Sequence, residues 1–263
     1  MATTTAATRG KSSGIKVTDA PAARGGSVGT SGAVQNTRWQ QADVREVIRL
    51  SPSIVVLRLS LPARVDHLPG QHYVVRLTAD DGYSASRSYS IASAPDDELV
   101  ELCVERLADG EVSGYLYDEL QPGDQLEVRG PIGGWFVWDA GKPALGIGGG
   151  SGVVPIVAMA RHADHTGAPD RLRIAASGRT PHELPYYQEL RDYGATVALT
   201  RHPNATPGVL GRRLAAEDLA PLMDGAATAY VCGSAGFAES ISQQLLMLGY
   251  PQSRIRLERF GPT

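Results

Sequence analysis

The first half of the chain, after its opening segment, is a succession of short runs in which apolar and β-branched residues alternate with polar ones. Turn signals such as Pro69-Gly70 and Asp80-Asp81-Gly82 separate these runs. Alternation of period two between turns is typical of antiparallel strands, and several such strands at short intervals form a sandwich or a barrel. The pattern predicts six antiparallel strands near residues 42–48, 54–61, 71–77, 83–90, 99–106 and 125–129.

One segment of this half, residues 109–120, changes to helical spacing. Val112, Leu116 and Leu120 would share one face of the helix. Its N-terminus would be formed by Gly110 to Ser113, and free backbone N–H groups there suit a phosphate. A connector helix that is capped by its own polar residues explains the same pattern, so both interpretations stay open.

The second half alternates short apolar runs with helical segments, which is typical of a parallel sheet covered by helices on both faces. Strands are expected near residues 143–147, 171–176, 195–200, 227–232 and 255–260, and helices near 156–162, 182–192, 210–222 and 236–248. The change of pattern divides the chain into a barrel domain at residues 37–140 and an α/β domain at residues 141–263. Residues 1–36 are rich in Ala, Thr, Gly and Ser without an apolar period and predict a disordered tail, with a basic, hydroxyl-rich transit peptide as the alternative.

Composition narrows the partners and the compartment. The 263 residues carry a formal net charge of −3 without a long basic run, so nucleic acid is not an expected partner. No apolar run approaches the roughly 18 residues that span a bilayer. Cys103 and Cys232 are too few for a disulfide framework or a cluster held by four cysteines, which fits a reducing, cytoplasmic compartment. The six His residues show no ligand spacing, so no metal site is predicted.

The predicted strand near residues 83–90 carries the first candidate chemistry, in Arg87-Ser88-Tyr89-Ser90. Strand geometry places Arg87 and Tyr89 on one face and the two serines on the other. The guanidinium offers forked donors to a phosphate, and the phenol ring offers a stacking plane to a flat ligand. An ordinary strand with an exposed Arg and a half-buried Tyr would show the same four residues.

A Gly-rich loop, Gly148-Gly149-Gly150-Ser151-Gly152, follows the first strand of the second half and precedes a helix. This order is expected where backbone amides cradle a phosphate or a pyrophosphate. The spacing matches neither the Gly-x-Gly-x-x-Gly fingerprint nor the Walker loop with its Gly-Lys-Ser/Thr ending. The loop therefore indicates a nucleotide without identifying it.

Two further stretches would emerge at the same edge, because ligands of parallel sheets lie beyond the carboxyl ends of the strands. Ser177 and Arg179 could hold the 2′-phosphate that distinguishes NADPH from NADH, although a plain surface turn is an equal alternative. Cys232-Gly233-Ser234 ends another apolar strand. A lone Cys in that place is more often a small core residue than a reactive one.

The order of these pieces resembles the ferredoxin–NADP reductase superfamily, over about residues 39–263. Arg87-x-Tyr89-Ser90 is similar to its flavin motif, and Gly110-x-Val112-Ser113 to its second flavin-phosphate element. The loop from Gly148 to Pro155 resembles its Gly-x-Gly-x-x-Pro sequence, with Ser151 where Thr is commoner. Cys232-Gly233-Ser234 resembles the element beside the nicotinamide, and Glu258-Arg259-Phe260 the carboxylate and aromatic that close the flavin pocket.

The resemblance implies roles for individual residues. Arg87 would hold the flavin phosphate, Tyr89 would stack on the isoalloxazine, and the Ser90 hydroxyl would contact its reactive nitrogen. Ser90, Cys232 and Glu258 are the implied catalytic residues. The implied cofactor-binding set is Arg87, Ser88, Tyr89, Ser90, Gly110, Val112, Ser113, Phe260, Gly149, Gly150, Ser151, Gly152, Ser177, Arg179, Cys232, Gly233 and Ser234.

The implied fold is a six-stranded flavin-binding barrel followed by a nicotinamide-binding α/β domain. The implied activity is a flavin-dependent oxidoreductase that moves a hydride from NADPH or NADH to FAD, with FMN as the less favoured flavin. Electrons would then pass to a separate acceptor, with a ferredoxin, a haem protein and a molybdenum enzyme all open. The alternative is a non-catalytic flavin- or nucleotide-binding subunit of a larger complex. The chain lacks the cysteines of the [2Fe–2S] module that some members carry.

Overall fold

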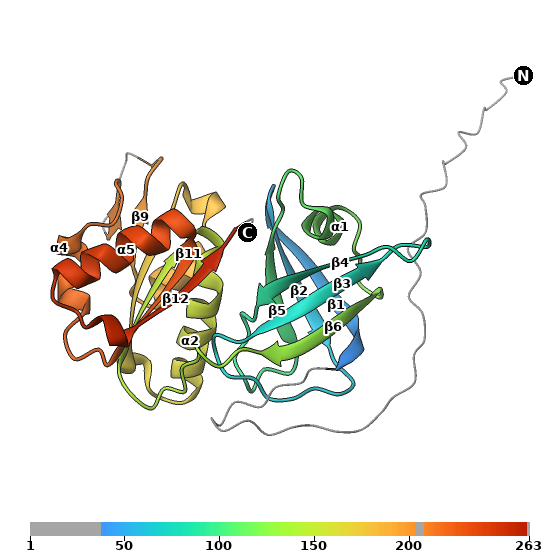
Figure 1. The fold of residues 1–263 in the computed structure, drawn as a ribbon, viewed down its shortest axis with the longest axis horizontal. Coiled ribbons are helices and arrows are strands. Elements are labelled where there is room, and N and C mark those ends of the chain that lie inside the picture. Colours follow the sequence, from blue (N-terminus) through green and yellow to red (C-terminus); the bar gives the residue numbers. More distant parts are fainter. Residues whose placement is uncertain (1–37, 203–207, 262–263) are drawn as a thin grey trace, which may run out of the picture.

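The computed structural model describes residues 38–202 and 208–261. Two sheets of six strands each follow one another along the described chain, and Figure 1 shows them as two bodies side by side. The predicted disordered tail at residues 1–36 lies outside the described residues. No helix within the described ranges has the length and apolar character that crossing a membrane requires.

The first sheet is antiparallel, as the alternating pattern predicts. Its strand order is β4-β3-β6-β1-β2-β5. The two edge strands approach each other through a bridge between Ile91 and Leu102, which brings the sheet toward closure as a barrel. The strands are β1 (Trp39–Ser51), β2 (Ile54–Ser60), β3 (His72–Thr78), β4 (Ser84–Ser90), β5 (Val100–Glu105) and β6 (Gln125–Ile132).

Helix α1 (Glu111–Asp118) covers the opening between β4 and β5. Val112, Leu116 and Leu120 all belong to the barrel core, so the apolar face predicted from the helical spacing is the buried face. Gly110 is the N-cap residue, and no side chain caps the first turn. The free N–H groups of that turn therefore stay available to a ligand.

The second sheet is parallel, with the strand order β10-β9-β8-β7-β11-β12. Its strands are β7 (Ala144–Gly149), β8 (Leu172–Gly178), β9 (Thr196–Leu199), β10 (Val209–Leu210), β11 (Thr228–Ser234) and β12 (Ile255–Phe260). The α-helices are α2 (Val154–His165), α3 (Tyr187–Asp192), α4 (Ala216–Leu219) and α5 (Ala235–Met247). Short 3₁₀ turns occupy η1 (Gly150–Val153), η2 (Pro169–Arg171), η3 (Pro181–Glu183), η4 (Ala220–Leu222) and η5 (Gln252–Arg254).

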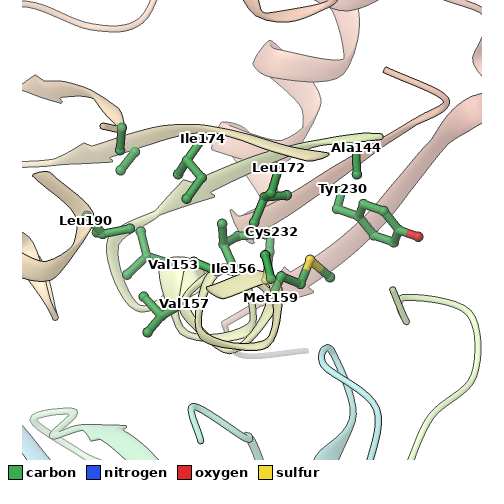
Figure 2. Packing of buried hydrophobic residues seen from close by; sticks show 14 of the residues in the cluster. Ala144, Val153, Ile156, Val157, Met159, Leu172, Ile174, Leu190, Tyr230 and Cys232 are labelled. Carbon is green, nitrogen blue, oxygen red and sulfur yellow. The ribbon is translucent and has the colours of Figure 1, made fainter. Parts of the chain in front are cut away.

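Two apolar cores lie on opposite faces of this sheet. Figure 2 shows one of them, in which Val153, Ile156 and Met159 lie beside Cys232 and Tyr230 of β11. The other core packs Ile241 and Leu245 of α5 against residues on the opposite face of the strands, among them Ile147 and Val231. Helices cover both faces, which confirms the predicted fold class of an antiparallel barrel followed by an α/β sheet.

Two of the predicted helices are wrong in extent. The predicted helix at residues 210–222 is absent over residues 210–215, because Leu210 pairs with Ala198 as part of strand β10. The backbone N–H of Ala215 donates to the Asp218 carboxylate, so the helix begins only at Ala216.

The predicted helix at residues 182–192 begins only at Tyr187. Pro185 disfavours helical geometry at the residue before it, and Tyr186 then takes a left-handed φ of 56°. The segment upstream of Pro185 forms the separate turn η3 instead. A proline inside an otherwise periodic segment therefore sets this boundary.

The barrel core predicts a large stability effect at α1. Leu116 is fully buried, so Leu116→Ala should lower the free energy of unfolding by about 2–5 kcal/mol through lost burial and the cavity left behind. Urea denaturation measures this change. Met247→Ala, at an exposed position of α5, is the control and should stay within about 0.5 kcal/mol of the parent protein. Equal effects at the two positions would contradict the place of α1 in the core.

Candidate functional site

Strand β4 carries the sequence-predicted Arg, Tyr and Ser residues at the edge of the barrel. The pairing of Tyr89 with Tyr73 and of Arg87 with Val75 puts both predicted residues on the side of the sheet that these core residues occupy. Arg87 is exposed, and its guanidinium donates to the carbonyl of the preceding residue. A guanidinium group held only by a hydrogen bond to the neighbouring backbone can turn toward a ligand phosphate.

Ser90 ends this strand and differs from the other serines of β4. Its side chain is only 5% exposed, and its hydroxyl has no hydrogen-bond partner in the described protein. Burying a hydroxyl without a partner costs about 1–3 kcal/mol. Such an atom is expected where a bound molecule completes the site, and Ser88 on the same side of the strand is exposed instead.

At the start of α1, the side chains of the predicted phosphate element have structural roles, and its backbone N–H groups are left for a ligand. The Ser113 hydroxyl accepts from the Leu107 N–H at 3.2 Å and donates to the Gly110 carbonyl at 3.3 Å, so it stabilises the preceding loop. Val112 points into the barrel core. A Cβ at Gly110 would overlap the Ser113 hydroxyl, so the tight turn requires glycine. The backbone N–H groups of the first turn are what this element can offer to a phosphate.

Three glycines form a close-packed cradle at the carboxyl edge of the parallel sheet. A Cβ at Gly152 would overlap the carbonyl oxygen of Cys232, and one at Gly149 or Gly233 would come within 2.7 Å of the Phe237 ring. Side chains are therefore excluded where the loop after β7 meets the loop after β11. Gly150 has a left-handed φ of 57° with open space around it, and Ser151 follows it in η1. Backbone atoms line this edge, as close approach of a nucleotide requires.

Cys232 and Glu258 are neighbours on β11 and β12 beside this cradle. The Cys232 thiol has no exposed surface. Its pKa is raised well above the ordinary value, mainly by burial and to a smaller extent by the charge of the nearby Glu258. Burial also raises the pKa of Glu258 to about 7, and its Oε2 atom has no hydrogen-bond partner within the described residues. The thiol is therefore neutral near pH 7, and the carboxyl group titrates there.

The predicted 2′-phosphate residues Ser177 and Arg179 both lie at the carboxyl end of strand β8. Ser177 pairs with Gly149 in the parallel sheet. Arg179 is exposed, and its guanidinium lies 3.6 Å from the Glu183 carboxylate. The backbone N–H of Arg201 donates to the Arg179 carbonyl at 2.8 Å, which brings a second exposed arginine to this edge. The sequence interpretation missed Arg201, although it directly follows a predicted strand whose carboxyl end belongs to the same edge.

The last two predicted residues lie opposite each other where β11 and β12 end. Ser234 pairs with Phe260, and its hydroxyl accepts from the Phe237 N–H at 3.3 Å as the N-cap of α5. Phe260 is half-buried against the core that contains α2. Figure 1 shows this end of β12 at the side of the sheet that faces the barrel.

The predicted residues fall into two groups, one on the barrel and one on the parallel sheet. Within residues 38–202 and 208–261, no hydrogen bond joins the two groups directly. The barrel segment after Ser90 nevertheless reaches the other domain, because the Ala92 carbonyl accepts from Arg161 of α2 at 3.0 Å. The same helix begins directly after the glycine cradle. The geometry thus brings an edge strand of the barrel and a nucleotide-type loop to one seam.

Comparison with known proteins agrees with this geometry. Residues 41–137 match the family of oxidoreductase FAD-binding domains. A flavohemoprotein of Pseudomonas putida is 32% identical over 210 residues, which are 74% of this chain and 51% of that protein. The ferredoxin–NAD(P)(+) reductase component of naphthalene 1,2-dioxygenase/salicylate 5-hydroxylase systems from a Ralstonia species is 27% identical over 245 residues, which are 88% of this chain and 71% of that protein.

A similar solved structure is the FAD/NAD-binding domain of nitric oxide dioxygenase from Vibrio cholerae O1 biovar El Tor. It superposes with a TM-score of 0.75 at 27% identity and covers 85% of this chain and 99% of that domain. The chain spans about half the length of the first curated relatives that it matches, 51% of one and 56% of the next.

The raised pKa of Glu258 predicts a specific pH dependence of stability. The folded protein keeps this proton up to about pH 7, whereas the unfolded chain releases it near pH 4.5. Stability should therefore fall as the pH rises through that window. Glu258→Gln should reduce the difference in unfolding free energy between pH 5 and pH 8, by roughly 3 kcal/mol at most.

Urea denaturation at the two pH values measures the effect. Glu239→Gln, which replaces an exposed carboxyl group on α5, is the matched control and should leave the pH dependence unchanged. If Glu258→Gln and Glu239→Gln gave the same pH profile, the Glu258 carboxyl would not be the buried titrating group.

Proposed function

We propose that the chain is a member of the ferredoxin–NADP reductase superfamily, an NAD(P)H-dependent flavoprotein reductase that passes electrons to a separate redox protein. The family match on residues 41–137 and the architecture of the whole described chain both support this proposal. The barrel domain, residues 37–140, would bind FAD, and the α/β domain, residues 141–263, would bind the nicotinamide nucleotide. Bound FAD supplies the redox chemistry, since it accepts a hydride from NAD(P)H and releases electrons to an acceptor.

The residues of the barrel fit a flavin dinucleotide. Arg87 and the uncapped first turn of α1 would hold its phosphates through charge-assisted and backbone hydrogen bonds. The Tyr89 ring would lie against its flat ring system. FAD is favoured over FMN because the matched family is one of FAD-binding domains.

The observation that carries the proposal is the buried Ser90 hydroxyl without a partner. A protein that binds nothing at this place would leave the cost of burying that oxygen uncompensated. A hydrogen bond from a bound flavin offsets the cost and orients the ring. In the other domain, the Glu258 Oε2 atom is also buried without a hydrogen-bond partner, and a bound ligand would likewise offset that cost.

The carboxyl edge of the parallel sheet fits the nucleotide. The cradle of Gly149, Gly152 and Gly233 allows close approach of a pyrophosphate. Cys232 and Glu258 then lie where the nicotinamide would be covered, and the neutral thiol excludes water without adding charge. Ser177 and Arg179, joined by Arg201, favour NADPH over NADH, because the two exposed guanidinium groups attract a 2′-phosphate.

The electron acceptor would be a separate protein, such as a ferredoxin or a haem protein. The relatives support both kinds of acceptor: one is a flavohemoprotein, and another is the reductase component of a dioxygenase system.

A cytoplasmic location is supported by Cys103 and Cys232, which are free thiols.

An absorbance spectrum recorded during titration with NADPH tests the proposed function. The purified protein should be yellow with about one FAD per chain, and NADPH should bleach the flavin band. A yellow protein that neither NADPH nor NADH can bleach would instead indicate a non-catalytic flavin-binding subunit. A protein that binds no flavin after reconstitution would contradict the proposal outright.

Ser90→Ala should slow flavin reduction while flavin stays bound. Loss of one hydrogen bond to the ring is expected to lower the reduction rate roughly tenfold in a stopped-flow trace. The control is Ser86→Ala on the same strand, because Ser86 is exposed and directly precedes the Arg87–Ser90 motif. An unchanged reduction rate in Ser90→Ala would remove the role given to this hydroxyl.

Arg179→Ala should erode the preference for NADPH. Loss of a charge-assisted hydrogen bond to the 2′-phosphate is expected to raise the KM for NADPH about tenfold or more and to leave the KM for NADH nearly unchanged. The control is Arg45→Ala on the barrel, since Arg45 is likewise exposed and lies 3.5 Å from a carboxylate. An equal loss for both nucleotides would count against the assigned 2′-phosphate contact.

A further inference from the structure

The second domain covers the outer face of barrel strands β2 and β5. Along β5, Leu102 and Val104 belong to the barrel core, so Glu101 and Cys103 face outward, yet both are buried. A separate apolar cluster explains this burial, because it joins the two domains. Its members are Ile54, Val56, Ala92 and Cys103 of the barrel and Val154 at the start of α2, with Tyr186 packed against them.

Glu101 places a carboxylate inside this seam, with only 4% of its surface exposed. One oxygen, Oε1, accepts from Arg161 and from the Tyr186 hydroxyl, both at 2.8 Å. The other, Oε2, accepts from Arg58 of the barrel at 2.8 Å. Burial alone would raise the pKa of Glu101, but the Arg161 charge and these hydrogen bonds hold that pKa below its ordinary value. The carboxylate therefore stays ionised.

Arg161 is the matching cation on α2. Its Nε and one terminal nitrogen donate to both oxygens of Glu189 on α3, at 2.7 and 2.9 Å. Its other terminal nitrogen donates to Glu101 and to the Ala92 carbonyl of the barrel. The guanidinium also lies over the Tyr186 ring, 5.0 Å from its centroid. One side chain thus binds α3 of its own domain and two sites on the barrel.

At Tyr186, the contacts of the seam outweigh the usual backbone preference of a residue with a side chain. Its backbone adopts a left-handed φ of 56°, which is unfavourable for a residue with a side chain. The contacts that hold this conformation are the hydroxyl bond to Glu101 and the packing against the seam cluster. Strain of this kind persists only where the surroundings over-determine the position.

The network lies between the two halves of the proposed site. The Ala92 carbonyl is two residues beyond Ser90, and the Ala92 N–H donates to the Glu101 carbonyl at 2.8 Å. On the other side, Arg161 follows the glycine cradle on the continuous helix α2. A contact from Arg161 to Glu101 and Ala92 therefore fixes the spacing between the Ser90 segment and the loop that would hold the nucleotide.

We propose that Glu101 and Arg161 are a positioning pair that locks the two domains in the arrangement that electron transfer from nucleotide to flavin requires. This inference rests on the proposed function. Neither residue belongs to the set proposed to bind the flavin or the nucleotide, so the pair would act on the reduction rate and not on the affinity for either cofactor. Rates of transfer depend steeply on alignment, and a displacement of about 1 Å costs on the order of 100-fold.

A second contact between the domains is weaker and lies at the rim. His165 of α2 is 2.9 Å from the Asp96 carboxylate, and both side chains are largely in solvent. Exposed pairs of this kind contribute little to stability, whereas removing one partner of a buried pair leaves the other charge buried without compensation. The buried pair is therefore the one to test.

The test compares Glu101→Gln with Glu127→Gln in the full chain carrying its flavin. Glu127 is the matched control, because it also pairs with an arginine, Arg76, but both residues belong to the barrel. Glu101→Gln should lower the limiting rate of flavin reduction at saturating NADPH roughly tenfold or more, with flavin content and KM within about twofold of the parent. Glu127→Gln should leave all three unchanged.

Cys103 provides a measurement that does not depend on turnover. This free thiol is buried in the seam beneath Tyr186, so alkylation reports how often the domains separate. Its labelling, read by mass spectrometry of the Cys103 peptide with and without flavin, should accelerate roughly tenfold in Glu101→Gln and not in Glu127→Gln. Arg161→Lys keeps the charge but loses the fork to Glu189, and it should show intermediate values in both measurements.

Three results would overturn the positioning role. The first is a reduction rate in Glu101→Gln equal to that of the parent protein. The second is a lower rate that is accounted for by loss of flavin or by a raised KM, and the third is a Cys103 labelling rate that does not change. A parent protein that neither nucleotide reduces would overturn the proposed function instead. Cys103 labelling would then still decide whether Glu101 and Arg161 hold the domains together.

Discussion

Two barrel strands that are apolar on both faces constrain the whole molecule. The inner residues of β2 and β5 fill the barrel, and their outer residues Ile54, Val56 and Cys103 would meet water if the barrel stood alone. The hydrophobic effect therefore requires a cover on that face, and Val154 and Tyr186 of the second domain provide it. Everything at the seam follows from this packing, including the approach of the glycine cradle to the segment after Ser90.

The seam also shows how surroundings set the state of a buried carboxyl group. Glu101 receives three hydrogen bonds, two of them from guanidinium groups, and stays charged. Glu258 has an unpartnered oxygen, and its pKa is raised to about 7. The two glutamates thus differ in charge state because their surroundings differ: hydrogen bonds and nearby cations lower one pKa, and burial raises the other. A carboxylate with hydrogen bonds from two guanidinium groups keeps its charge, whereas a buried carboxyl group without such partners titrates near neutral pH.

Local patterns in the sequence were sufficient for the fold class and for most elements. Strand alternation located the barrel, and the spacing of Val112, Leu116 and Leu120 identified the face of α1 that closes it. The helix predicted from Leu210 failed because its start depends on pairing with Ala198, which local pattern does not contain. Candidate site residues could be proposed from the sequence wherever one short motif carried several of them, and their roles stay predictions.

The seam network was not legible, because its members are 60 and 28 positions apart in the chain and meet only through tertiary packing. One signal was available. Glu101 stands within the run Val100-Glu101-Leu102-Cys103-Val104, which is otherwise apolar on both faces. A charged residue in a strand that is buried on both sides needs a partner from elsewhere. The exposed Arg179 and Arg201 face no such demand, so the nucleotide preference proposed for them could change without disturbing the alignment proposed for the buried pair.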